Sequence, residues 1–125
     1  PERFEIGGCA VLLPQKAVVS FSLAIHELAT NAAKYGALSV AQGKVAISWD
    51  YEEQIGRLRF KWVERGGPAV TPPTRKGFGS RLVERLLAAE LNGRSTISYN
   101  PTGVICEIDA ILDPDGWLGR PGSDR

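Results

Sequence analysis

The sequence has few of the residues that build metal clusters and disulfide frameworks. It contains two cysteines, Cys9 and Cys106, and one histidine among 125 residues. The cysteines lack a C-x-x-C spacing and lie in strand-like surroundings, so we interpret both as reduced core residues. A histidine and cysteine metal cluster is excluded, because a single histidine cannot complete its ligand set.

Long apolar runs and an excess of one charge are also absent. No apolar stretch approaches the roughly eighteen residues of a membrane span, and no charged-then-apolar leader precedes a cleavage site. Fifteen basic residues stand against 14 acidic ones, and this formal charge of +1 gives no electrostatic case for nucleic acid or a membrane surface. We therefore expect a cytoplasmic protein without nucleic-acid or membrane contact, in which any anion is bound locally.

The hydrophobic patterns predict one α+β domain over residues 1–112. A chain of this length buries about two-thirds of its unfolded surface around one core. In order, we expect a strand or strand pair over 3–13, a helix opened by Pro14 and capped by Gly36, a hairpin over 45–62, a helix over 80–91, and a hairpin over 94–112. Helices against one face of a mixed, mostly antiparallel sheet make a two-layer α/β sandwich. Residues 113–125 lack a pattern and are predicted to be a disordered tail.

The first predicted helix combines an apolar side with a polar stripe. Its apolar side is formed at helical spacing by Val18, Phe21, Ile25, Leu28, Ala29 and Ala32. Beside it, Glu27, Asn31 and Lys34 share one face and offer a carboxylate, an amide and an ammonium group. Such a stripe is usually only the solvated face of an amphipathic helix, so its interpretation depends on the motifs that accompany it.

The first hairpin ends in Trp62-Val63-Glu64, followed closely by Gly66 and Gly67. This strand end carries a carboxylate, and the two glycines permit a close backbone approach to a ligand. A carboxylate buried there needs a hydrogen-bond donor. An exposed glutamate at a strand end is an equally ordinary alternative.

A second glycine motif, Gly77-Phe78-Gly79-Ser80, directly precedes the second predicted helix. Free backbone N–H groups and the positive end of the helix dipole meet at this position, which suits a phosphate group. The motif is not a P-loop, and Leu82 replaces the third glycine of the dinucleotide pattern.

The pair His26-Glu27 begins like the zinc motif H-E-x-x-H, but Thr30 occupies the position of the second histidine. His26 points about 100° away from Glu27 around a helix. We interpret His26 as a packed or hydrogen-bonded structural histidine rather than a nucleophile.

Three separated motifs resemble the GHKL ATPases and histidine kinases. The segment His26 to Gly36 is similar to their N box, and Gly77 to Leu82 is similar to their G2 box. His26 together with Trp62-x-Glu64 resembles one branch, the HWE histidine kinases. The resemblance implies the Bergerat fold and two ligands, ATP and Mg²⁺.

The resemblance also implies roles for individual residues. Asn31 would bind the Mg²⁺ that bridges the phosphates, Glu27 stands where ATP-hydrolysing relatives hold a general base, and Lys34 would reach the phosphates. Glu64 stands where an aspartate accepts a hydrogen bond from the adenine amine. The remaining nucleotide contacts are expected from Gly66, Gly67, Gly77, Phe78, Gly79, Ser80 and Leu82, with residues 68–76 as a lid.

The implied function is that of an ATP-binding catalytic domain of an HWE-type sensor histidine kinase. Such a domain transfers the γ-phosphate of ATP to a histidine on an upstream dimerisation domain. We expect that domain outside this chain, a response regulator as the further partner, and a homodimeric full-length protein. Two alternatives stay open: a free-standing GHKL serine kinase of the anti-sigma type, against which Trp62-x-Glu64 argues, and a nucleotide-binding regulatory module without transfer activity.

Overall fold

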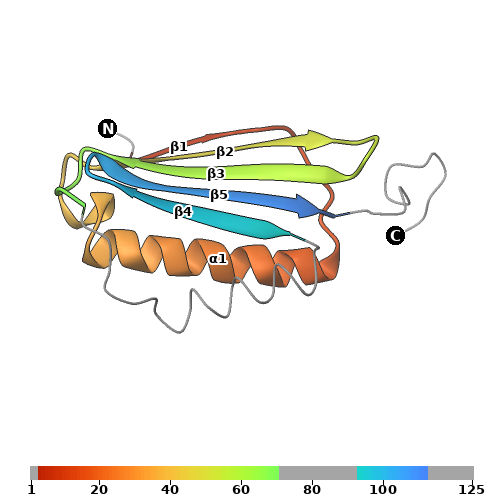
Figure 1. Cartoon of the computed structure of the whole chain (residues 1–125), viewed down its shortest axis with the longest axis horizontal. Helices are drawn as coiled ribbons and strands as arrows, with labels where there is room; N and C mark the ends of the chain where they lie inside the picture. Colours follow the sequence, from red (N-terminus) through yellow and green to blue (C-terminus); the bar gives the residue numbers. More distant parts are fainter. Residues whose placement is uncertain (1–2, 71–92, 113–125) are drawn as a thin grey trace.

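The structure, a computed structural model, describes residues 3–70 and 93–112. Within these ranges the elements are strand β1 (Phe4–Gly7), helix α1 (Gln15–Lys34), the short 3-10 helix η1 (Ala37–Ser39), and strands β2 (Lys44–Glu52), β3 (Arg57–Arg65), β4 (Arg94–Asn100) and β5 (Gly103–Ile111). The strands form one layer and α1 forms the other (Figure 1).

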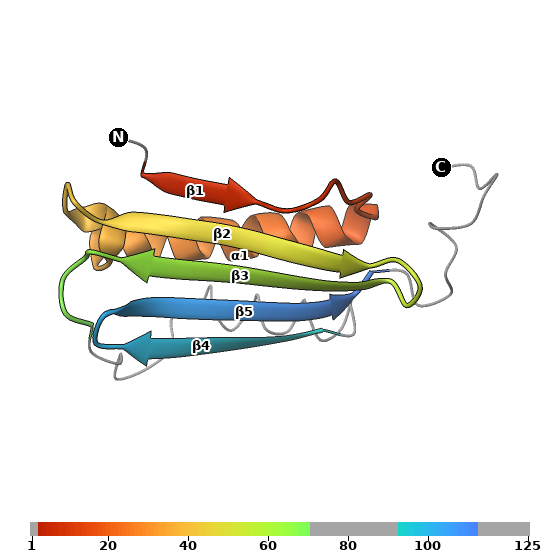
Figure 2. The ribbon, with the colours of Figure 1, turned by 90° about the horizontal axis from the view of Figure 1, so that it is seen from above.

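The five described strands form a mixed sheet in the order β1-β2-β3-β5-β4. Strand β1 runs parallel to β2, and every other neighbouring pair is antiparallel. Seen from above, α1 crosses beneath the sheet (Figure 2). The predicted α+β arrangement, with a mixed but mostly antiparallel sheet covered on one face, is confirmed. Both predicted hairpins are present.

Alternation along the strands places a core between the sheet and α1. Trp62, Val45 and Ile108 are almost fully buried on the inner face of the sheet. The ring of Phe21 on α1 meets that of Phe60 on β3 edge to face, with centroids 5.8 Å apart. These contacts fix the helix to the middle of the sheet.

The buried side of α1 differs from the predicted one. Phe21, Leu28 and Ala32 are buried as expected, but Val18 and Ile25 are 46% and 37% exposed. The full buried set on the helix is Ala17, Ser20, Phe21, Ala24, Leu28 and Ala32. The small side chains Ala17, Ser20 and Ala24 occupy much of this side, whereas the prediction favoured the larger apolar residues.

The prediction of strand structure throughout residues 3–13 is wrong beyond Gly7. After β1 the chain leaves the sheet and reaches α1, with the Trp49 indole N–H donating to the Cys9 carbonyl at 2.6 Å. Cys9 is therefore exposed and is not the core residue that we expected. Its apolar neighbours Val11 and Leu13 pack against the core without pairing as a strand.

Cys106 is buried on β5 as predicted. Both thiols are free, which agrees with the predicted reduced state. Burial raises the pKa of the Cys106 thiol to about 12, with a smaller contribution from the negative charge of Glu107. The predicted helix over 80–91 and the tail over 113–125 lie outside the described residues.

Candidate functional site

The structure places the polar stripe along the C-terminal half of α1. Asn31 and Lys34 are exposed and Glu27 is half-buried. The Asn31 side-chain nitrogen lies 3.4 Å from Glu27 Oε2, so the amide donates to the carboxylate one turn earlier. The three residues therefore share one side, as the spacing predicts.

Glu64 is a buried carboxylate with two donors. It is only 4% exposed, on the inner face of β3. Its Oε1 accepts a hydrogen bond from the Ala37 backbone N–H at 3.0 Å, and its Oε2 accepts one from the Trp62 indole N–H at 2.9 Å. The alternative of an exposed strand-end glutamate is thus wrong. Residues two apart on a strand share a face, which is why the Trp-x-Glu spacing allows this contact.

Glu64 lies directly against the end of α1. The predicted C-cap is one residue too late, since Tyr35 is the C-cap and Gly36 has φ −113°, outside the left-handed region. Gly36 serves another purpose, because a Cβ at this position would overlap Glu64 Oε1. Glu64 therefore lies at the junction that follows Lys34, the last residue of the helix that carries the polar stripe.

Gly66 and Gly67 let the chain after β3 pass the α1–β2 connection. Gly66 has φ +76°, and a Cβ there would lie 2.8 Å from the carbonyl oxygen of Gln42. A Cβ on Gly67 would lie 2.7 Å from the Ala37 Cα. We expected these glycines to let a ligand approach the backbone. In this structure they let the segment after β3 approach the backbone of the α1–β2 connection.

Some of the predicted site residues lie outside the described residues, and His26 lies within them. Gly77, Phe78, Gly79, Ser80 and Leu82 lie outside the described residues, as does the lid after Val70. His26 is exposed on α1, and no hydrogen bond of its side chain occurs among the described residues. The interpretation of His26 as a packed histidine is therefore wrong, and its interpretation as a hydrogen-bonded histidine stays a prediction.

The described residues contain no group of three or more histidine, cysteine, aspartate and glutamate side chains that could hold a metal ion. Asn31 could instead provide a single oxygen ligand to a metal ion. Its amide nitrogen is engaged with Glu27, and no hydrogen bond to its Oδ1 occurs within residues 3–70 and 93–112. One such oxygen suits Mg²⁺, which keeps several waters and takes few protein ligands.

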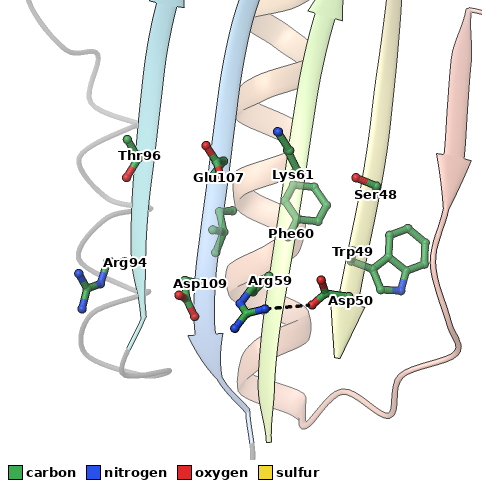
Figure 3. A pocket seen from close by; sticks show the side chains of 11 residues that line it. Ser48, Trp49, Asp50, Arg59, Phe60, Lys61, Arg94, Thr96, Glu107 and Asp109 are labelled. Carbon is green, nitrogen blue, oxygen red and sulfur yellow. Dashed lines mark ion pairs between the residues drawn. The ribbon is translucent and has the colours of Figure 1, made fainter. Parts of the chain in front are cut away.

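The opposite face of the sheet carries a hollow of about 500 Å³ that has a different character (Figure 3). Asp50, Arg59, Asp109 and Arg94 stand side by side in register across β2, β3, β5 and β4. Charges therefore alternate across the face. The negative charges offset the positive ones, so this face has no excess of positive charge for the phosphates of a nucleotide.

Arg57 and Asp109 form the best-defined ion pair on that face. The Arg57 Nε lies 2.9 Å from Asp109 Oδ1, and a second contact joins Nη2 to Oδ2. This fork of hydrogen bonds lowers the pKa of Asp109 against the smaller opposing effect of burial. We assign this pair to the stability of the sheet.

Solved structures with the same fold define the class of protein. The histidine kinase domain of the Erythrobacter litoralis EL346 blue-light activated histidine kinase matches with a TM-score of 0.68 and 23% identity, over 93% of this chain and 54% of that one. Histidine kinase ThkA, solved in complex with the response regulator TrrA, matches with a TM-score of 0.64 and 14% identity, over 90% of this chain and 34% of that one. The fold is that of a histidine kinase catalytic domain.

No protein-family model matches the chain. Comparison with individual protein sequences nevertheless shows its family. A blue-light-activated histidine kinase of Brucella anthropi is 44% identical over 115 residues, covering 90% of this chain and 23% of the relative. The protein of the same name in Brucella ovis is 38% identical over 119 residues, covering 94% and 24%. The chain belongs to the histidine kinase family, and it spans about a quarter of the length of these relatives.

Proposed function

We propose that this chain is the ATP-binding catalytic domain of an HWE-type sensor histidine kinase. The observation that carries the proposal is the buried Glu64 carboxylate, held by Trp62 at the end of the helix that presents Glu27, Asn31 and Lys34. The N-box residues and the Trp62-x-Glu64 motif thus occur on neighbouring elements of a histidine kinase catalytic-domain fold, which supports the proposal.

The polar stripe would serve the phosphate end of ATP. Asn31 would hold Mg²⁺ through its Oδ1, and the ion would neutralise charge that develops on the phosphates during transfer. Lys34 would add a positive charge one turn further along, and Glu27 would act as a general base. The Asn31–Glu27 hydrogen bond supports this arrangement, because it engages the amide nitrogen and leaves the amide oxygen for the metal ion.

Glu64 would recognise adenine. Two donors already point at its oxygens, but an ionised carboxylate accepts about four hydrogen bonds, so it can take a further one from the exocyclic amine. Guanine presents a carbonyl oxygen where adenine presents that amine. An acceptor facing another acceptor is unfavourable, and this contrast would give a preference for ATP over GTP.

The other expected parts of the reaction lie beyond this chain. A histidine on an upstream dimerisation domain would receive the γ-phosphate and pass it to a response regulator, and the full-length protein would be a homodimer. The complex of ThkA with TrrA offers a parallel for the regulator. No helix within the described residues is both long and apolar enough to cross a bilayer.

Calorimetric titration with ATP and with GTP, each with and without Mg²⁺, tests this function. We expect ATP to bind more tightly with Mg²⁺ than without it. GTP should bind roughly five-fold or more weakly, since an unpaired buried acceptor costs about 1 to 3 kcal/mol. Comparable affinities for the two nucleotides would contradict the role of Glu64. No binding of either nucleotide would contradict the proposed function.

A further inference from the structure

The backbone of Ala37 is held by two oppositely charged side chains, one at its N–H and one at its carbonyl oxygen. Its N–H donates to Glu64 Oε1 at 3.0 Å, and its carbonyl oxygen accepts from Arg3 Nη2 at 3.2 Å. Arg3 and Glu64 are 61 positions apart in the sequence, and the first ends the segment before β1 while the second lies near the end of β3. Ala37, which follows the helix, thus connects Arg3 just before β1 with Glu64 near the end of β3.

Arg3 holds more of this connection than Ala37 alone. Its Nη2 also lies 2.6 Å from the Val40 carbonyl oxygen, and its Nε lies 2.8 Å from that of Gly43. Its own carbonyl oxygen accepts from the Val45 N–H at 2.9 Å, which ties Arg3 to the start of β2. The guanidinium therefore gathers three carbonyls of the connection that joins α1 to β2.

Close packing makes this connection rigid. A Cβ on Gly43 would overlap the carbonyl oxygen of Ala37, and a Cβ on Gly36 would overlap the Glu64 carboxylate. The Ser39 hydroxyl donates to the Gly36 carbonyl at 2.5 Å. Hydrogen bonds to charged groups are stronger than neutral ones, and successive bonds polarise one another. The connection consequently has little freedom to shift while both charges hold it.

We propose that Arg3 and Glu64 are positioning residues that fix the C-terminal end of α1, and with it Asn31 and Lys34, for the metal and phosphate end of the nucleotide. The inference rests on the proposed function. It gives Glu64 a second role, which acts through the backbone of Ala37 rather than through adenine. It also gives Arg3 an effect on Mg²⁺-dependent binding, although its hydrogen bonds within the described residues join the backbone of Ala37, Val40, Gly43 and Val45.

The hydrogen bonds are tested first in the nucleotide-free chain, by the amide resonance of Ala37 and the indole resonance of Trp62. Glu64→Gln keeps the shape but offers one acceptor and one NH₂ donor to two N–H groups, so one contact becomes donor against donor. We expect both resonances to move upfield, the one that faces the NH₂ group because its hydrogen bond is lost and the other, by less, because its acceptor is no longer charged. Adding Trp62→Phe removes one of the two donors, which lets the amide oxygen turn to Ala37. The Ala37 resonance should then return toward its wild-type position.

The effect on the site is tested by ATP titration of Arg3→Ala with and without Mg²⁺. We expect the gain in affinity from Mg²⁺ to fall by roughly five-fold or more, the lower end of typical coupling between sites, while metal-free binding changes little. Arg59→Ala is the matched control, because it removes an arginine whose ion pairs lie on the opposite face of the sheet. That variant should keep the full gain.

These experiments distinguish a failure of the positioning role from a failure of the proposed function. If Arg3→Ala and Arg59→Ala keep the same Mg²⁺ gain while ATP still binds, the positioning role is overturned and the proposed function survives. An unchanged Ala37 resonance in Glu64→Gln would likewise overturn the positioning role alone. If the wild-type chain binds no ATP at all, both proposals fail.

Discussion

The Asn31 amide nitrogen donates to Glu27 Oε2 across one turn of α1, at 3.4 Å. Both residues belong to the proposed phosphate end of the site, yet the contact leaves them with different tasks. The amide offers an oxygen to a cation, whereas the carboxylate offers a base. Substitutions that remove one capacity at a time therefore separate a nucleotide site from an ordinary solvated helix face.

Asn31→Ala should abolish most of the Mg²⁺-dependent gain in ATP affinity and leave metal-free binding nearly unchanged, because it removes the metal-ligand oxygen and the hydrogen bond to Glu27 but leaves Glu64 unchanged. Glu27→Gln keeps the shape of the side chain and should leave ATP binding intact, while phosphoryl transfer falls by about 10² to 10⁴ from loss of a general base. Calorimetry and a transfer assay measure the two effects. Equal weakening by both variants with and without Mg²⁺ would reduce the stripe to a solvated face.

The chain alone should bind ATP without forming an acid-labile phosphohistidine. Its one histidine, His26, points about 100° around α1 from Glu27, so it does not face the proposed phosphate position. Incorporation of labelled phosphate from γ-labelled ATP measures this, with His26→Gln as the control. A dimerisation domain supplied as a separate chain should restore some transfer, weakly, because the covalent link no longer raises its effective concentration. Labelling of the wild-type chain that disappears in His26→Gln would show that His26 accepts the phosphate, which contradicts this prediction.

The Arg57–Asp109 pair predicts a particular dependence of stability on pH. Arg57 lowers the pKa of Asp109 in the folded state, so the pair stabilises the fold above the ordinary aspartate pKa. That contribution is lost as the pH falls through the lowered value. Asp109→Asn should therefore reduce the urea midpoint at pH 7, and the difference from wild type should shrink below about pH 4.

Asp50→Asn provides the comparison for this experiment. Asp50 lies on the same face but is 4.0 Å from Arg59, and its side chain is 69% exposed. Its replacement should change the midpoint little at either pH. A pH-independent deficit in Asp109→Asn would point to lost packing instead of a lost ion pair.

The two thiols should differ sharply in reactivity. Cys9 is exposed, whereas Cys106 is buried with its pKa raised to about 12. At pH 8 roughly one Cys106 thiol in ten thousand is ionised, so a disulfide reagent should modify Cys9 quickly and Cys106 only when the sheet opens. Cys9→Ser should remove the fast phase, and Cys106→Ser should keep it. Two equally fast phases in the wild-type chain would contradict the burial of Cys106.

Local sequence patterns were sufficient for several parts of the fold. Both hairpins follow from period-2 alternation, since side chains on a strand alternate between a buried and a solvated face. Pro14 predicts the start of α1, because proline is compatible with a helix start but not with its interior. The spacing of Glu27, Asn31 and Lys34 predicts their shared side for an equally local reason.

Other features depended on contacts between distant segments. The path of residues 8–13 was decided by Trp49, which binds the Cys9 carbonyl from a strand 40 residues further on. The buried side of α1 was decided by which side the helix turns toward the sheet, so that Ala17 and Ala24 lie inside while Val18 lies partly outside. No local period contains that information.

The sequence by itself determined which residues we propose for the chemistry of the candidate site, because residue type and helical or strand spacing depend only on neighbours along the chain. Only the tertiary structure decided that Glu64 accepts from the Ala37 N–H, that Arg3 donates to the Ala37 carbonyl oxygen, and that Gly36 leaves room for a carboxylate. These contacts bridge 27 and 34 positions. They form because the packing of α1 on the sheet brings those positions together, and only then does a buried charge find its donors.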